Sequence, residues 1–446
     1  MQTFFRLVLP LALLTSCRLA TANSQITVSP LSHLQRIDGF GASDAWYAWE
    51  IHNFSSANQT AILDALFSTS TGAGLSLLRH RIPCEIEPSP GVWDWTTDTD
   101  TVWLSKQAIA RGVSQVWATA WSPPAWMKTN NNVNNGGELA PSHYQDYATF
   151  LATYVSHYTT VFGVPIWGVS IANEPDINAS YESSIWNSQQ FHDFIANNLM
   201  PTFQSAKTPA RVIMPELSQW SDYAAAATLA DPVTSKFVGT IAAHQYAGSL
   251  APFTDAINAN KTVWETEVSN LGTDDPSIND GLYWAQVLHN TVTYGRVNAW
   301  HYWWLFSDSS DTTGQSLIQG SPSTNTFTIK KRLWTIGNFS RFVRPGSHLV
   351  TTTSTNPESG VYTSAYVGPD GTLTVVAINT NTTATTLTVH SGETGKWTCS
   401  EYRTSATEDL SYVGSPTVLA GTVQATLTAR SVTTLHFQYT GALPPP

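Results

Sequence analysis

The sequence predicts an α/β fold, a (β/α)8 TIM barrel with a fused side β-sandwich. Eight short apolar segments alternate with helical segments, and a region rich in Thr, Ser and Val with alternating polarity follows residue 345. Short apolar runs are typical of strands buried on both faces of a parallel sheet. Eight strand-and-helix repeats in series favour a closed barrel. A doubly wound open sheet is the alternative, but no glycine-rich phosphate loop supports it.

The first 23 residues have the pattern of a secretory signal peptide. Arg6 precedes an apolar run at residues 7–14, and residues 20–22 fit the small-x-small cleavage rule, so the mature chain is expected to begin near Asn23. The apolar run is far shorter than the ~20 residues of a membrane span. We therefore expect a secreted, extracellular monomer without a membrane partner.

Residues 38–345 form the expected barrel. The predicted strands are centred on residues 37–41, 75–82, 115–121, 166–172, 212–215, 237–243, 262–267 and 298–304. The clearest helix begins at Ser142, where Ser142 and Gln145 fit a capping box and apolar residues then recur every three or four positions. Residues 191–200 and 285–294 are further helix predictions.

Residues 346–440 form the expected β-sandwich. Alternating patterns at residues 372–378 and 431–437 are typical of antiparallel strands separated by turns. Residues 24–37 are expected to contribute an N-terminal strand to this domain, and residues 441–446 to form a disordered tail. After signal removal Cys84 and Cys399 remain, and both one disulfide and two buried free thiols are open.

The composition excludes some partners and favours others. The formal net charge is −11, and loss of the two positive charges at Arg6 and Arg18 makes it −13, so nucleic acid is not an expected partner. Some of the 18 tryptophans fill the core, but their excess suits a protein that stacks rings on sugar faces. About half of the six glycosylation sequons are expected to carry glycan in a eukaryotic host. These sequons are Asn53, Asn58, Asn178, Asn260, Asn338 and Asn381.

Two glutamates carry the expected chemistry. Glu174 follows the fourth predicted strand and Glu267 ends the seventh, and the C-terminal ends of barrel strands share one rim. A retaining glycosidase needs two carboxyl groups about 5–5.5 Å apart, one as acid and base and one as nucleophile. Glu265 and Glu216 compete for these roles, although both are expected to lie deeper. For Glu174 to act as the acid, we expect its pKa to be raised in the free enzyme.

Other strand ends supply candidate substrate-binding residues. Arg79 or Arg81 is placed to keep the nucleophile ionised, although a surface role is equally open for Arg81. Asn173 is placed to bind a sugar 2-hydroxyl. No cluster with metal-site spacing surrounds His244, so we expect no metal and no cofactor. The complete set of substrate-binding candidates is Arg79, Trp121, Asn173, His244, Tyr246, Trp303 and Trp46.

Several blocks of this chain resemble glycoside hydrolase family 30. They are residues 39–43, 77–79, 121–130, 170–176, 264–267 and 337–346, in order along nearly the whole mature chain. The Trp-Ser-Pro-Pro block and the Asn-Glu-Pro block are the most specific. The resemblance implies a retaining enzyme with a barrel and a side sandwich, in which Glu174 is the acid and base and Glu267 the nucleophile.

Within that family, residues 135–139 and 181–186 most resemble the members that cleave xylan. The resemblance implies a secreted hydrolase of plant cell-wall β-1,4-xylan, either glucuronoxylan or xylo-oligosaccharides. The bacterial glucuronoxylanases of the group carry arginines just after the eighth strand, whereas residues 305–310 contain none and add Asp308. Strict dependence on glucuronate branches is therefore not expected. Endo-β-1,6-glucanase, β-1,6-galactanase or glucosylceramidase-like activity and, in another class, a non-catalytic carbohydrate-binding protein are the alternatives.

Overall fold

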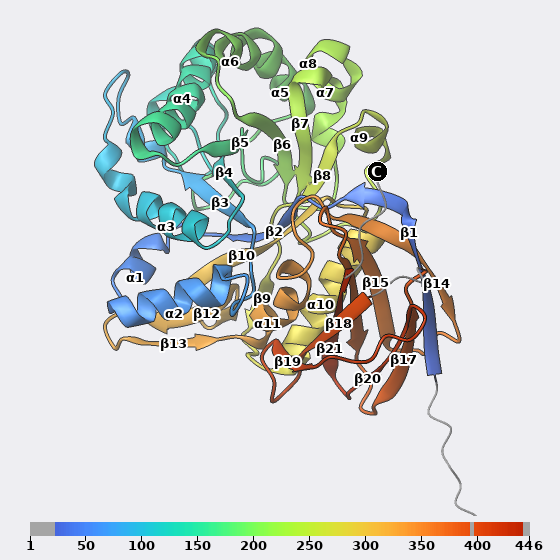
Figure 1. The fold of residues 1–446 in the computed structure, drawn as a ribbon. Coiled ribbons are helices and arrows are strands. Elements are labelled where there is room, and N and C mark those ends of the chain that lie inside the picture. The colour runs from blue at the N-terminus through green and yellow to red at the C-terminus, as the bar shows by residue number, and fades with distance from the viewer. Residues whose placement is uncertain (1–22, 393–396, 440–446) are drawn as a thin grey trace, which may run out of the picture.

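A computed structural model describes residues 23–392 and 397–439. Its centre is a parallel barrel of eight strands, and Figure 1 shows helices around it and the sandwich strands to one side. The barrel strands are β2 (Gly39–Ser43), β3 (Leu77–Ile82), β4 (Gln115–Ala120), β5 (Ile166–Ser170), β6 (Arg211–Leu217), β7 (Val238–Ala243), β8 (Thr262–Glu265) and β10 (Ala299–Asp308). Strand β10 pairs with both β2 and β8, which closes the barrel and confirms the predicted fold. The signal-peptide residues before Asn23 and the predicted tail lie outside the described residues.

The barrel interior explains part of the tryptophan content. Trp117 and Trp264 are fully buried in its lumen, where they pack with Leu77 and Ile213. Tryptophan rings fill a volume that smaller side chains would leave empty, which makes the barrel a packed core. The C-terminal ends of the barrel strands therefore lie over a densely packed interior.

Helices cover the outside of the barrel. They are α1 (Ala48–His52), α2 (Ser56–Phe67), α3 (Thr99–Ala110), α4 (Tyr144–His157), α5 (Ser188–Phe194), α6 (Met200–Ala206), α7 (Ala226–Ala230), α8 (Pro232–Phe237), α9 (Thr254–Asn258), α10 (Ile278–Thr293) and α11 (Lys331–Ser340). Every helix in the described residues is too short or too polar to cross a lipid bilayer.

The predicted capping box at Ser142 is wrong. Helix α4 follows a 3-10 turn, Pro141–His143, and its N-cap, His143, makes no side-chain capping bond. The Gln145 side chain instead donates to Thr202 Oγ1 of α6 at 2.9 Å, so a contact between helices replaces the local one. A capping box does form at α5, where Asn187 and Gln190 bond reciprocally.

Four short strands lie near the eighth strand of the barrel, and two of them extend its sheet. Strand β12 (Ser316–Ser321) pairs in parallel with β10, and β13 (Thr326–Ile329) pairs antiparallel with β12. Strand β9 (Asn270–Thr273) and β11 (Thr313–Gly314) form a separate small ribbon. This ribbon brings the segments that follow β8 and β10 together beside the rim.

The β-domain is one nine-stranded sheet that curls around its own apolar core. Its strands are β1 (Asn23–Arg36), β14 (His348–Thr355), β15 (Val361–Val367), β16 (Leu373–Asn379), β17 (Thr385–His390), β18 (Trp397–Thr404), β19 (Ser411–Gly414), β20 (Thr422–Leu427) and β21 (Ser431–Tyr439). Strand β1 lies between β14 and β17, beside the orange strands of Figure 1. Its Ile26 and Val28 are buried in the core of this domain.

Helix α11 fixes the β-domain to the barrel through a buried amide. Asn338 Nδ2 donates to Thr434 Oγ1 at 2.9 Å, and Asn338 Oδ1 accepts from Thr404 Oγ1 at 2.7 Å. Asn338 is completely buried, and a glycan there is incompatible with this packing, so we expect this sequon to be among those that carry none. The other sequon asparagines are exposed or half-buried.

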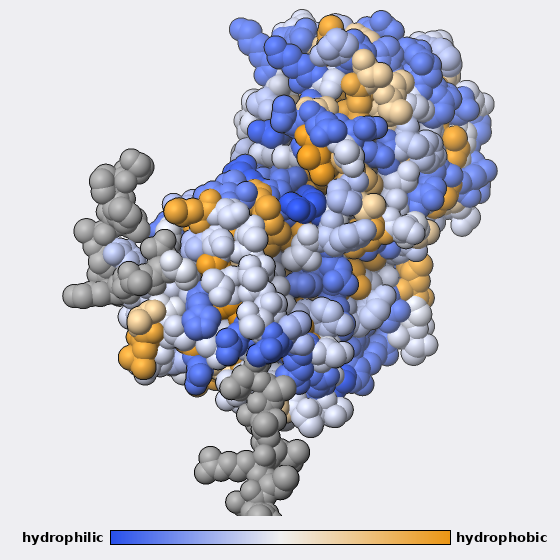
Figure 2. Space-filling view, turned by 90° about the vertical axis from the view of Figure 1, so that its right-hand side faces the viewer, coloured by the Kyte–Doolittle hydropathy of each residue, from blue (hydrophilic) through white to orange (hydrophobic). Residues whose placement is uncertain are grey.

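Two further features concern the cysteines and the surface. Cys84 in the barrel and Cys399 in the β-domain are both buried free thiols, which decides between the two alternatives left open by the sequence. On the face shown in Figure 2, hydrophilic side chains predominate and apolar ones lie in separate small groups.

Candidate active site

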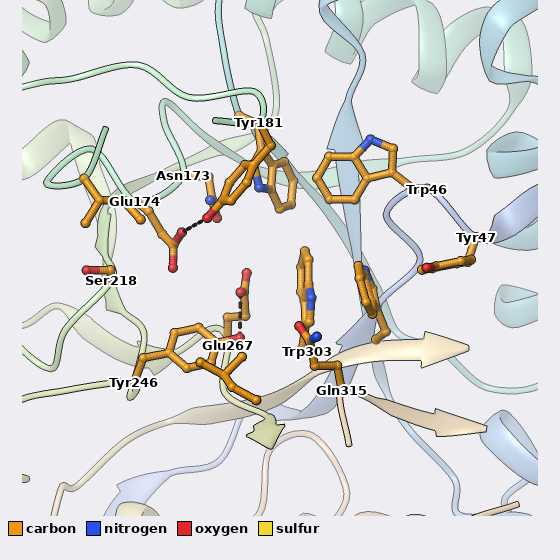
Figure 3. A pocket seen from close by; sticks show the side chains of 14 residues that line it. Trp46, Tyr47, Asn173, Glu174, Tyr181, Ser218, Tyr246, Glu267, Trp303 and Gln315 are labelled. Atoms are coloured by element: carbon orange, nitrogen blue, oxygen red, sulfur yellow. Dashed lines mark hydrogen bonds between the residues drawn. The ribbon is translucent and has the colours of Figure 1, made fainter. Parts of the chain in front are cut away.

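The barrel brings the two predicted glutamates together at one rim. Glu174 follows the end of β5 and Glu267 follows the end of β8. One oxygen of each lies within 4.8 Å of the other and of a His244 ring nitrogen. Two residues distant in sequence therefore face each other across a cleft (Figure 3).

The backbone is strained at the residues that shape this rim. Trp46, Glu174 and Glu216 have φ angles of 64°, 46° and 57°, in the left-handed region that residues other than glycine rarely adopt. Such a conformation costs on the order of 1–3 kcal/mol and persists where the surroundings enforce it. At Glu174 the backbone N–H donates to Glu216 O at 2.9 Å, which helps to hold the turn.

Glu267 is held from three sides. Arg79 Nη1 donates to Glu267 Oε2, and the Tyr246 hydroxyl donates to Oε1 at 2.9 Å. The backbone N–H of Glu267 donates to Glu265 Oε1 at 2.9 Å. Burial raises the pKa of Glu267, while the charges of His244 and Arg79 oppose that shift.

Glu174 is hydrogen-bonded at both carboxylate oxygens. His244 Nδ1 lies 3.2 Å from Oε1, and the Tyr181 hydroxyl donates to Oε2 at 2.8 Å. Burial acts to raise the pKa of Glu174, but the bond and charge of His244, the Tyr181 bond and Arg79 together lower it below the ordinary value. The expectation of a raised pKa for Glu174 is therefore wrong for the empty cleft.

His244 explains that reversal. Burial lowers the pKa of this imidazole, but the charge of Glu267 and the bonds with Glu174 and Glu216 outweigh burial and raise it to about 10. In the empty cleft the proton therefore resides on His244, beside an ionised Glu174. The sequence could not reveal this arrangement, because the groups that set it come from different strands.

Arg79 lies beneath the cleft and connects its parts. It is fully buried on β3, and its Nη2 donates to Asn173 Oδ1 at 2.7 Å and to Glu216 Oε1 at 3.1 Å. Its guanidinium also lies 4.5 Å from the ring centroid of Trp121, within cation–π range. The burial of Glu216 acts against ionisation, but Arg79 and His244 lower the pKa of that carboxyl to about 2.

The competing carboxyl groups do not reach the cleft. Glu265 and Glu216 are fully buried below it, and neither lines the pocket. Glu265 accepts from the backbone N–H of Glu267 and from that of His301 at 3.1 Å, so it supports the segment that carries Glu267. Burial raises the pKa of Glu265 to about 8.

The cleft is a pocket of about 640 Å³ with mainly aromatic walls. Its lining consists of Trp46, Tyr47, Trp121, Asn173, Glu174, Ile177, Tyr181, Ser218, Tyr246, Glu267, Leu271, Trp303, Trp304 and Gln315. Five of the predicted substrate-binding residues are among them. The other two, Arg79 and His244, are fully buried and contact the carboxylates from below.

Several lining residues received no role from the sequence. Tyr181, Tyr47, Ser218 and Gln315 lie in loops, where no periodic pattern marks a residue that faces a cleft. Tyr181 belongs to a block that resembles the family, and this was the only signal that could have drawn attention to it. Figure 3 shows its ring above Glu174.

Among the described residues, those that line the pocket include no lysine and no arginine. Arg81 is close to the rim, with its guanidinium 5.5 Å from the Trp46 ring centroid, but its charge is paired with Glu182 and Glu85. The carboxylates and His244 are close enough to converge on a cation. However, the protonated His244 and Arg79 already supply positive charge, so this donor set does not favour a metal.

Comparisons with known proteins agree with this geometry. Residues 102–272 match the glycosyl hydrolase family 30 TIM-barrel domain, and residues 346–435 match the family 30 beta sandwich domain. The catalytic domain of GH30 xylanase C from Talaromyces cellulolyticus is 33% identical, with a TM-score of 0.83 over 93% of this chain and 100% of that chain.

Two curated relatives are more distant in sequence. Glucuronoxylanase XynC of Bacillus subtilis is 28% identical over 423 residues, covering 93% of this chain and 92% of that protein. Endo-1,6-beta-D-glucanase BGN16.3 of Trichoderma harzianum is 25% identical over 413 residues, covering 81% of each. Barrel, sandwich and facing glutamates together show that this chain belongs to glycoside hydrolase family 30.

Proposed function

We propose that this hydrolase is a secreted enzyme that cleaves β-1,4-xylan with retention of anomeric configuration. The separation of the two carboxylates supports the retaining mechanism. One oxygen of each lies within 4.8 Å of the other, which fits the roughly 5–5.5 Å between the carboxyl groups of retaining glycosidases better than the roughly 6.5–9.5 Å of inverting ones. That separation leaves no room for a water molecule between nucleophile and sugar.

The reaction proceeds in two steps. Glu267 attacks the anomeric carbon while a protonated Glu174 gives its proton to the leaving oxygen, so the glycosidic bond breaks and a glycosyl ester forms. Glu174, now a carboxylate, then removes a proton from water, and the resulting hydroxide releases the sugar from Glu267. The buried Arg79 stabilises Glu267 whenever it leaves as a carboxylate.

The preference for xylan is supported by two named relatives that act on it and by the chemistry of the lining. Trp46, Trp121 and Trp303 offer aromatic surface for neutral sugar faces. Because no lysine or arginine among the described lining residues can pair with a carboxylate branch, plain xylan and xylo-oligosaccharides suit the cleft at least as well as glucuronoxylan.

The substrate is tested by product chromatography after incubation with plain xylan, glucuronoxylan, β-1,6-glucan and β-1,6-galactan. We expect cleavage of both xylans at rates within about tenfold of each other. If xylan stays intact and β-1,6-glucan is degraded, the xylan proposal is wrong, and the substrate is the one named for the Trichoderma relative. If none of the four polymers is cleaved, the carbohydrate-binding alternative gains support.

The mechanism is tested on the polymer that is cleaved. Proton NMR of the first product should show the anomer of the substrate, and an inverted anomer contradicts the proposal. Glu267→Ala should lower kcat by about a thousandfold or more, because it removes the attacking atom. A variant that retains a tenth of the wild-type rate would show that Glu267 is not the nucleophile.

A further inference from the structure

Tyr181 occupies the side of Glu174 that faces the cleft. It lies in the loop between β5 and α5, lines the pocket and is 46% exposed. Its hydroxyl is 2.8 Å from Glu174 Oε2, as the dashed line in Figure 3 indicates. Within the described part of the chain, this carboxylate is the only hydrogen-bond partner of the hydroxyl.

The other oxygen of Glu174, Oε1, is bonded to the buried side chain of His244. His244, 3.2 Å from Oε1, is fully buried and also lies 3.7 Å from Glu216 and 3.8 Å from Glu267. Oε1 therefore has a partner that is fixed in the barrel, whereas the partner of Oε2 is a half-exposed side chain in a loop. Because its partner can be displaced, Oε2 is the oxygen suited to pass a proton to a leaving group, and in the empty cleft Tyr181 holds it.

We propose that Tyr181 is a positioning residue for acid catalysis, which holds Glu174 Oε2 in the empty cleft and gives up that place to the leaving oxygen. This inference rests on the proposed role of Glu174 as acid and base. The Tyr181 hydroxyl fixes the rotamer of the Glu174 side chain before substrate binds, so the carboxyl group already lies where the glycosidic oxygen will bind. Because the ring is half-exposed in a loop, it can move without disturbing the barrel.

The exchange also changes the proton affinity of Glu174. The groups that face this carboxyl are Arg79 from β3, Glu216 from β6, His244 after β7 and Glu267 after β8, together with Tyr181. The first four are fixed by the barrel. When the Tyr181 hydroxyl moves away, Glu174 loses a hydrogen-bond donor that stabilises its ionised form. The pKa of Glu174 therefore rises as the leaving oxygen takes the place of the hydroxyl. This rise explains how a carboxyl with a low pKa in the empty cleft becomes an acid when substrate is bound.

The test is the pH dependence of kcat/KM for Tyr181→Phe, which keeps the ring and removes the hydroxyl. The substrate is an unactivated oligosaccharide of the glycan identified above, so that departure requires a proton. The limb of the bell-shaped profile that is governed by Glu174 should move to higher pH by about 0.5–1 unit, because the Glu174 carboxylate loses one hydrogen bond. The limb governed by Glu267 should stay in place.

Two controls make the result specific. Tyr283→Phe removes a phenol that is 58% exposed in a neighbouring groove and should leave the profile unchanged. Equal melting temperatures for the variants and the wild type exclude a merely structural effect. A Tyr181→Phe profile that coincides with the wild-type profile overturns the inference.

Glu174→Gln separates this inference from the function on which it rests. If Glu174→Gln is inactive on the oligosaccharide while the Tyr181→Phe profile does not shift, the role of Tyr181 alone is disproved. If Glu174→Gln cleaves the oligosaccharide at the wild-type rate, the assignment of Glu174 as acid fails, and with it the proposed mechanism.

Discussion

Replacement of Arg79 by lysine would test whether the cleft depends on a guanidinium or only on a positive charge. Arg79 bonds with four side chains through three nitrogens: Nε donates to Thr119, Nη1 to Glu267, and Nη2 to both Asn173 and Glu216. A lysine keeps the charge but carries only three donors, all on one nitrogen, so it cannot replace the four bonds of the guanidinium. A hydrogen bond to a charged group contributes about 1.5–3 kcal/mol.

The loss of one such bond predicts a fall in kcat/KM of roughly 10- to 150-fold for Arg79→Lys, at about 1.36 kcal/mol per factor of ten. The assay is steady-state hydrolysis of the polymer identified by chromatography, with thermal unfolding as a check on folding. Arg211→Lys is the matched control, because that exposed arginine stacks on Trp167 at the opposite end of the strands. A folded Arg79→Lys variant within threefold of the wild type would refute the argument.

Three further outcomes follow from buried polar groups. Asn338→Ala should lower the free energy of unfolding by about 1–3 kcal/mol in urea titrations, because the hydroxyls of Thr404 and Thr434 lose a buried partner; a change below about 0.5 kcal/mol contradicts this. Mass spectrometry of protein from a eukaryotic host should find glycan at exposed Asn53 and none at Asn338. Burial raises the pKa of Glu265 to about 8 in the folded state, so its protonation contributes stability that is complete below the unfolded value of 4.5 and is lost as pH rises through 8. Glu265→Gln should therefore gain melting temperature relative to the wild type between pH 5 and pH 8, and a constant difference would disprove the shift.

The parts of the fold that the sequence predicts well are those set by short-range patterns. Buried parallel strands are short and apolar, so the predicted segment at residues 115–121 differs from β4 by a single residue. Once the barrel is inferred, its topology alone assigns Glu174 and Glu267 to one rim. Two catalytic candidates could therefore be named without coordinates.

The remaining features depend on contacts between distant residues. The low pKa of Glu174 results from His244, which comes from another strand, and a single sequence does not reveal that pairing. The start of α4 was misjudged because Gln145 bonds with a neighbouring helix. The sequon motif at Asn338 does not indicate whether the asparagine is buried, so its burial could not be predicted from the sequence.

The position of β1 has a consequence for how the polypeptide can be divided. Its neighbours β14 and β17 are encoded after the entire barrel, so the catalytic domain is an insertion within the sheet that flanks it. Expression of residues 346–440 alone would remove an interior strand from that sheet and leave β14 and β17 as two unpaired edges. During synthesis, the partners of the Ile26 and Val28 side chains emerge last, so the β-domain can fold only when the chain is nearly complete.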